Sequence, residues 1–166
     1  MDPQLLISEG AIDLDPSKAS HHDGDTYSDG VTTYRERFCD TAEVAGSYGN
    51  KCWGDQYGIG EFAGINFGKR GKEYAIAAFQ NAQHVQIIKG NIVDGRKLVA
   101  TIIDGQSLPC LLIREGLAWE NVSHYYEGQL DNLPPLPDQA YKAAKLAEQH
   151  FQKPWEYKND AEPCQE

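Results

Sequence analysis

Hydrophobic and polar residues alternate in several short stretches of the chain, and β-branched and aromatic residues are frequent among them. A period of two with this composition predicts strands. The Asp-Gly pairs at Asp23-Gly24 and Asp29-Gly30 predict tight turns that make a hairpin of the region before Cys39. A further pair of strands is expected around a connection at residues 91–95. The stretches predicted as strands are residues 4–8, 31–39, 84–90 and 97–104.

Three other stretches have the spacing of a helix. Ala75, Ala78, Phe79 and Ala82 fall on one stripe and predict a short helix over residues 72–82. Two more helices are indicated by their capping residues: Ser107 and Gly116 bound residues 108–115, and Asp138 and Pro154 bound the last helix. The order strands, helix, strands, helix, helix indicates an α+β fold built on a small barrel.

Length and composition bound the class of protein. A chain of 166 residues, 40% hydrophobic and 24% charged, is expected to form one globular domain. No apolar run approaches the ~20 residues that a membrane helix needs, and the acidic start does not resemble a signal peptide, which leaves the compartment open. The four cysteines lack the spacing of a zinc site.

The net charge of −10 argues against binding of nucleic acid through a broad basic surface. The charge is uneven, however. Residues 35–97 hold nine Lys and Arg against seven Asp and Glu, a balance of +2, and the remainder carries −12. An anionic ligand is therefore expected in the middle of the chain, with affinity that rests on a few local contacts and depends only weakly on salt.

Residues 44–66 hold six glycines together with Tyr48, Trp53, Tyr57 and Phe62. This composition predicts a long irregular loop. Its aromatic side chains suit stacking on nucleic-acid bases, and they suit packing of the loop onto the barrel equally well.

The carboxylates between His21 and Glu43 form two motifs with chemical potential. Asp23 and Asp25 flank a glycine and offer oxygen ligands to a hard cation, although an Asp-Gly pair is also an ordinary turn. Asp40 and Glu43 have the spacing of a helix capping box, and they can also belong to a metal or catalytic site. His21 and His22 suit a polar turn better than a metal site.

The arginines complete the pattern. Arg35 and Arg37 are two apart on an expected strand and so share a face, whereas Asp40 would point to the opposite face unless the chain turns after Cys39. Arg96 lies far downstream beside a turn. Phosphodiester hydrolysis needs a metal ion, a base and cations that stabilise the developing charge, and these carboxylates and arginines supply all three.

Three blocks in this order resemble the staphylococcal-nuclease-like (thermonuclease) family: DGDT at residues 23–26, RERFCDTAE at 35–43 and DGRKLVATIIDGQSLPCLLIREGLA at 94–118. The closing KPWEY also resembles that family. The resemblance implies a domain at residues 21–157, after an extension with the first strand at 1–20 and before a tail at 158–166. It further implies a five-stranded OB-type barrel with three helices.

The resemblance also implies a calcium-dependent (Ca2+) nuclease that acts on DNA, RNA or both and leaves 3′-phosphate ends. The roles carry over by motif. Asp25 and Asp40 would bind calcium with the Thr41 carbonyl, and Asp23 would be an outer acid. Glu43 would activate water, and Arg35 and Arg96 would hold the phosphate. Tyr125 and Tyr126 fall where the family has tyrosines near the substrate.

Two residues depart from the family pattern: Ala42 replaces a proline, and Asp94 replaces the tyrosine that precedes Gly-Arg. Asp94 puts a negative charge beside Arg96, which would either weaken substrate binding or require more metal. Two other classes of protein stay open. One is a non-catalytic OB-type module that binds nucleic acid or protein, and the other is an interaction protein whose binding element is the loop at residues 44–66.

Overall fold

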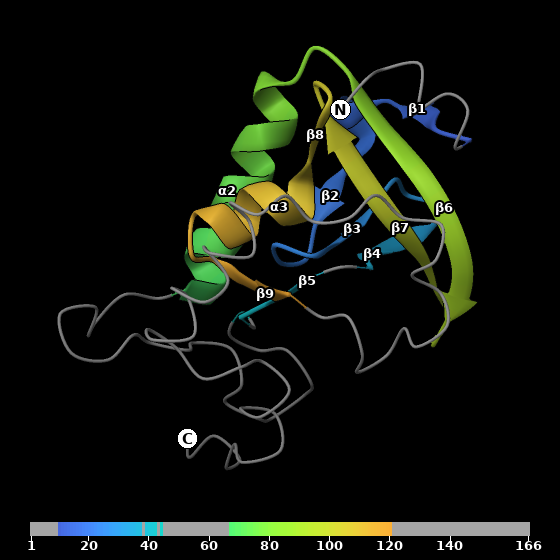
Figure 1. The fold of residues 1–166 in the computed structure, drawn as a ribbon. Coiled ribbons are helices and arrows are strands. Elements are labelled where there is room, and N and C mark those ends of the chain that lie inside the picture. The colour runs from blue at the N-terminus through green and yellow to red at the C-terminus, as the bar shows by residue number, and fades with distance from the viewer. Residues whose placement is uncertain (1–9, 38, 43, 45–66, 121–166) are drawn as a thin grey trace, which may run out of the picture.

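The computed structural model describes residues 10–37, 39–42, 44 and 67–120 (Figure 1). Several predictions lie outside these residues: the strand at residues 4–8, almost all of the loop at 44–66, the helix after Asp138, and the roles of Glu43, Tyr125 and Tyr126. None of the helices in the described part of the chain is long and apolar enough to cross a membrane.

The described chain is α+β, as the sequence predicts. Its elements are β1 (Ile12–Leu14), the 3-10 helix η1 (Pro16–Lys18), β2 (Ser20–His21), β3 (Thr26–Ser28), β4 (Thr33–Glu36), β5 (Cys39–Thr41), α2 (Phe67–Asn81), β6 (Val85–Val93), β7 (Arg96–Ile103), β8 (Gln106–Ser107), α3 (Leu108–Arg114) and β9 (Ala118–Glu120). Two of the three expected helices are therefore confirmed.

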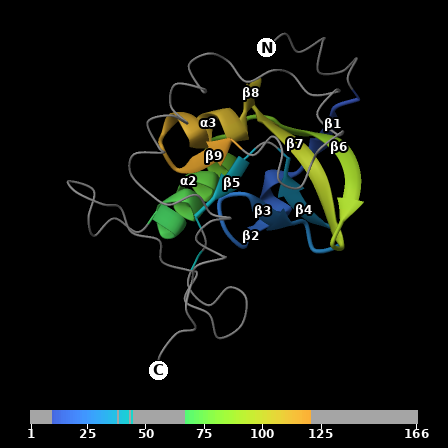
Figure 2. The ribbon, with the colours of Figure 1, turned by 60° about the horizontal axis from the view of Figure 1, so that its bottom comes forward.

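The strands form a curled mixed sheet, a half-barrel, with both helices on one side of it (Figures 1 and 2). The order is β1-β6-β7-β4-β3-β2, with the short β8 beside β7. Strands β4 and β7 run parallel, and the other pairs of this sheet are antiparallel. Strands β5 and β9 form a separate antiparallel pair.

Two Asp-Gly turns join β7 to its antiparallel neighbours β6 and β8. Asp94 and Gly95 have φ values of 51° and 75°, and Asp104 and Gly105 have 48° and 82°. Positive φ at both central residues is the mark of a type I′ hairpin turn, which suits the twist of the strands that it joins. The first turn is tighter than the connection expected at residues 91–95, because β6 continues to Val93, and it places Arg96 directly at the start of β7.

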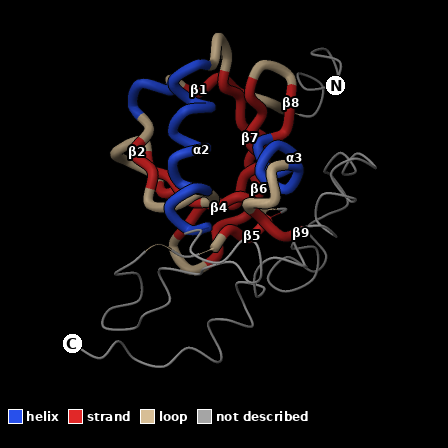
Figure 3. Tube along the Cα trace, turned by 90° about the vertical axis from the view of Figure 1, so that its left-hand side faces the viewer, coloured by secondary structure: helices blue, strands red, loops and turns tan. Residues whose placement is uncertain are grey.

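Helix α2 covers the open side of the half-barrel (Figure 3). Ala75 and Phe79 are buried, and Ala78 and Ala82 pack partly buried against the same core, as the predicted stripe requires. The helix begins at Phe67, one turn earlier than predicted. The two glycines in Phe67–Gly71 disfavour a helix locally, and burial of Phe67 against the core overrides that preference.

Helix α3 matches its prediction closely. The Ser107 side chain accepts a hydrogen bond from the Cys110 N–H at 3.4 Å, and the helix ends before Gly116, whose φ is 72°. Leu108, Leu112 and Ile113 are fully buried. The turn at Gly116 then directs the chain into β9, which pairs with β5 and so holds the segment that carries Asp40.

Candidate functional site

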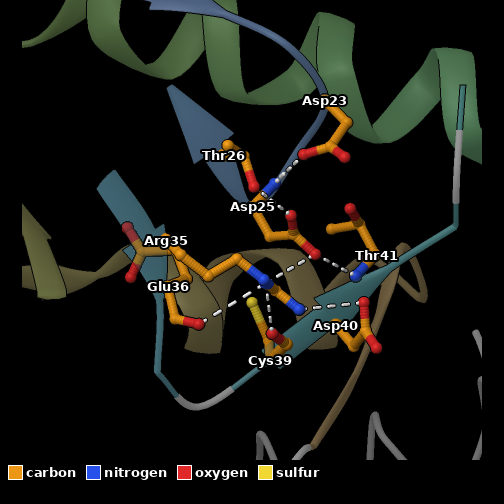
Figure 4. Close-up of polar contacts among 8 residues, drawn as sticks. All are labelled: Asp23, Asp25, Thr26, Arg35, Glu36, Cys39, Asp40 and Thr41. Atoms are coloured by element: carbon orange, nitrogen blue, oxygen red, sulfur yellow. Dashed lines mark hydrogen bonds and ion pairs between the residues drawn. The ribbon is translucent and has the colours of Figure 1, made fainter. Parts of the chain in front are cut away.

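Three separate segments meet at one cluster of buried charges (Figure 4). Asp23 and Asp25 lie in the connection between β2 and β3, Arg35 lies on β4, and Asp40 lies on β5. The side chains of Asp25, Arg35 and Asp40 are each at most 5% exposed. The structure therefore brings together the acidic motif, the arginine and the second carboxylate that the sequence singled out.

The chain changes direction earlier than the sequence predicted. The single strand expected over residues 31–39 is wrong at its end: β4 ends at Glu36, and β5 begins at Cys39 in a different sheet. The change of sheet lies between these strands, where the Arg37 N–H donates to the Val99 carbonyl at 3.0 Å. Pairing of β5 with β9 then rotates the strand, so that alternation along β4 no longer determines where Asp40 points.

Arg35 lies at the centre of the cluster. Its guanidinium forms ion pairs with Asp25 Oδ2 at 2.7 Å and with Asp40 Oδ1 at 3.1 Å. It also donates to the Cys39 carbonyl at 3.0 Å and more weakly to the Glu36 carbonyl at 3.4 Å. A buried guanidinium is stable only when charged and polar groups surround it, and here two carboxylates and two carbonyls do so.

Asp25 is held from several directions. Its Oδ2 accepts the Thr41 N–H at 2.8 Å as well as Arg35, and its Oδ1 accepts the Thr26 hydroxyl at 2.9 Å. The Asp25 N–H donates to Asp23 Oδ1 at 3.1 Å. The motif that reads as an Asp-Gly turn in sequence is thus also a rigid part of the site.

Gly24 explains why this motif needs a glycine. A Cβ at Gly24 would lie 2.7 Å from Thr41 Cγ2 and 3.0 Å from the carbonyl carbon and oxygen of Gly71 on α2. The loop therefore lies directly against both β5 and α2, with no room for a side chain. No local signal in the sequence indicated that Gly71 supports the site.

The donor set suits a hard cation in part. The Thr41 hydroxyl oxygen is buried and has no hydrogen-bond partner among the described residues, and it belongs to the residue that binds Asp25 through its N–H. Two buried carboxylates and this oxygen are ligands of the kind that calcium takes. Within the described chain, however, no group of three or more His, Cys, Asp or Glu is arranged as a metal site.

Arg96 lies on the same face of the sheet as Arg35. Arg35 pairs with Leu98 on the parallel strand β7, and paired residues share a face, as do residues two apart on one strand. The two Cα atoms are thus separated by one strand spacing and two residues, roughly 8 Å. Arg96 is half-buried and makes no hydrogen bond or ion pair with the part of the chain that the structure describes.

Glu36 is a buried acid next to the site that the sequence analysis passed over. It lies in the half-barrel, is fully buried, and accepts the Thr101 N–H at 3.2 Å through Oε2. Burial raises the pKa of Glu36 to about 8, against the lowering effects of the Thr101 hydrogen bonds and Arg35. Alternation on β4, with Tyr34 buried in the core, would have indicated this inward position.

Arg37 is also buried, and its side chain packs against β6. A Cβ at Gly90 would lie 2.9 Å from Arg37 Nη1, so the guanidinium packs directly on the backbone of this glycine. Arg37 is therefore not a solvated charge.

His21 differs from its expected position in a polar turn. It belongs to β2, and its ring lies edge-on against Phe79 with 4.5 Å between the ring centroids. Burial, with a smaller contribution from the charge of Lys72, lowers the pKa of His21 to about 4. Neither ring nitrogen has a hydrogen-bond partner in the described chain. His21 is thus a neutral, half-buried residue that packs against core aromatic rings.

Comparison with known proteins adds no assignment. No protein-family model matches the chain, and no curated protein matches it.

Proposed function

We propose that this protein is a calcium-dependent phosphodiesterase that hydrolyses DNA, RNA or both, of the staphylococcal-nuclease-like type. One observation carries the proposal: Arg35 pairs with both Asp25 and Asp40, at 2.7 and 3.1 Å, although the three residues come from different segments. Removing two carboxylates and a guanidinium from water costs free energy, so a role in stability alone is a poor reason for burying them. They are the groups that phosphodiester chemistry requires.

The residues divide into two functional groups. Asp25, Asp40 and the oxygens of Thr41 would hold the cation, which supplies Lewis-acid stabilisation of the phosphate when it is bound. Arg35 and Arg96 share a face of the sheet and would hold the phosphate oxygens, a task for which a planar guanidinium with a permanent charge is suited. By its place in the motif, Glu43 would orient and deprotonate the attacking water.

The topology supports a closed OB-type barrel as the scaffold of this site. The two ends of the strand order, β1 and β2, are consecutive in the chain and separated only by η1 and its flanking residues. Counted as one bent strand, they join with β3, β4, β6 and β7 to give the five strands of that fold. The third helix of the proposed domain would follow Asp138.

A non-catalytic binding module is the second candidate, and one observation favours it. In the described structure the Arg35 guanidinium is already bound by two carboxylates, so it reaches a phosphate only when a cation takes its place beside them. A protein that kept the cluster for structural reasons would show the same ion pairs.

Cleavage of single-stranded DNA and RNA, with calcium and with chelator, separates the two candidates. The nuclease cleaves only with calcium, and Glu43→Gln loses that cleavage while Glu73→Gln, an exposed carboxylate on α2, keeps it. Calcium-independent binding without any cleavage by the parent protein would instead establish the binding module.

A further inference from the structure

Strand β7 has a gap in the pairing along one of its edges. On that edge β4 is paired with β7 as far as Val99, and β8 takes up the pairing at Ile102. The other edge of β7 is paired with β6 along both stretches. Among the described residues, no strand therefore pairs with β7 at Ala100 and Thr101 on the side of β4.

The gap withdraws an acceptor from a buried N–H of the sheet. The Arg37 N–H donates to the Val99 carbonyl at 3.0 Å, as in a regular parallel ladder. The next bond of such a ladder would run from the Thr101 N–H to the Arg37 carbonyl, because each residue of a parallel strand bonds to residues two apart on its neighbour. Thr101 is fully buried, so its N–H cannot turn to water, and a donor without an acceptor there costs free energy.

The Glu36 side chain takes the place of that carbonyl. The Thr101 N–H donates to Glu36 Oε2 at 3.2 Å. Figure 4 shows the Glu36 carboxyl group turned away from the ion pairs of Arg35, as alternation along β4 requires. The last residue of β4 thus supplies the acceptor at the gap, and the chain after it can leave the sheet.

The backbone of Glu36 joins the candidate site at the same point. Its N–H donates to the Asp25 carbonyl at 2.9 Å, and its carbonyl accepts weakly from the Arg35 guanidinium at 3.4 Å. Three residues later β5 begins in another sheet and brings Asp40 to Arg35. Glu36 is therefore held by its N–H, its carbonyl and its side chain where the strand breaks.

We propose that Glu36 is a positioning residue: its carboxyl group fills the gap beside β7 and thereby fixes the break that turns Asp40 toward Arg35. Only the consequences for calcium binding and cleavage rest on the proposed function. The role needs an oxygen acceptor that reaches the Thr101 N–H, and it needs no charge. Glutamine supplies such an acceptor, whereas methionine has a similar length and only a weakly accepting sulfur.

Amide hydrogen exchange of the full chain, followed by NMR, is the test. The Thr41 N–H, which donates to Asp25 Oδ2, reports whether β5 is held at the site, and the amides of α2 report global stability. In Glu36→Met the Thr41 amide is expected to exchange about tenfold faster relative to the α2 amides, the usual effect of one lost hydrogen bond. Glu36→Gln keeps the ratio of the parent protein.

Tyr27→Phe is the matched control, because it removes a hydrogen bond to the Thr101 side chain in the same core and leaves the Thr101 N–H bonded. An unchanged Thr41 ratio in Glu36→Met, or an equal change in Tyr27→Phe or Glu36→Gln, would overturn the inference. If Glu36→Met does not fold, Glu36→Asp takes its place, since the shorter side chain withdraws the acid from Thr101. Failure of both variants to fold would assign Glu36 to stability alone and overturn the inference as well.

Calcium titration calorimetry and cleavage assays on the same variants separate the positioning role from the proposed function. Calcium affinity is expected to fall by roughly tenfold in Glu36→Met, the usual loss when a group that orients metal ligands is removed, and to persist in Glu36→Gln. If the parent protein neither binds calcium nor cleaves DNA or RNA while the Thr41 ratio changes as expected, the proposed function fails and the positioning role stands. Calcium-dependent cleavage with an unchanged ratio in Glu36→Met would retain the nuclease and remove the role of Glu36.

Discussion

Asp25 and Arg35 are joined by an ion pair of 2.7 Å, and the same Asp25 oxygen accepts the Thr41 N–H at 2.8 Å. One carboxylate oxygen thus links β4 to β5, two strands that belong to different sheets. This link gives the cluster a structural role that is separable from any catalytic one.

Removal of the guanidinium tests that structural role. Arg35→Gln leaves two buried carboxylates without their countercharge, so the free energy of unfolding is expected to fall by about 3–5 kcal/mol. Calcium should raise the free energy of unfolding by more in this variant than in the parent protein, because the guanidinium no longer competes for the carboxylates. Urea unfolding with and without calcium measures both effects. Arg96→Gln is the matched control, and equal calcium increments in all three proteins would contradict the shared site.

The contact between Gly24 and Gly71 predicts opposite effects of the same substitution. Gly24→Ala forces a Cβ to within 3.0 Å of the α2 backbone and is expected to cost about 1–3 kcal/mol. Gly71→Ala meets nothing closer than 3.7 Å and gains up to about 1 kcal/mol of helix propensity. Thermal unfolding of both variants checks the contrast. Similar stability of the two would mean that the loop does not lie against the helix.

Glu36 predicts a stability that declines as pH rises. Its pKa is about 8 in the folded protein against the ordinary glutamate value of 4.5, so the folded state holds an extra proton between these values. The corresponding stability is fully present below pH 4.5 and is lost as pH rises through 8, a change of a few kcal/mol. Glu36→Gln should flatten this decline when urea unfolding is compared at about pH 5 and about pH 9. Glu73→Gln should leave the decline unchanged, and a decline that persists in Glu36→Gln would assign it to another group.

Arg96 is expected to matter for cleavage and little for folding. It is half-buried and has no polar partner among the described residues, so Arg96→Ala should change stability by no more than about 0.5 kcal/mol. Calcium-dependent cleavage should fall by about 10²–10³-fold, the usual loss when one charge-stabilising donor is removed. Lys97→Ala, the adjacent cation on the other face of β7, is the control. Equal rates for parent and Arg96→Ala would remove this residue from the site.

Local signals predicted much of this protein from the sequence. The predicted Asp23-Gly24 and Asp29-Gly30 pairs lie in the connections of two hairpins, between β2 and β3 and between β3 and β4. Gly30 has a positive φ of 92°, which glycine adopts without strain. Ser107 and Gly116 bounded α3, and the alternation of residues 97–104 marked a strand of the core. Each of these features depends on interactions within a few residues along the chain. The DGDT motif and Arg35 were identified in the same way.

Contacts between distant segments decided the rest. Whether Asp40 faces Arg35 depended on the pairing of β5 with β9, some eighty residues away, and on a break in the strand between Glu36 and Cys39. The need for glycine at position 24 came from a helix that begins more than forty residues later. The burial of Glu36 depended on Thr101 and the curl of the sheet. Sequence alone therefore specified the strands, turns and reactive side chains, and tertiary packing decided which of those side chains share one buried site, because electrostatic pairing requires proximity in space.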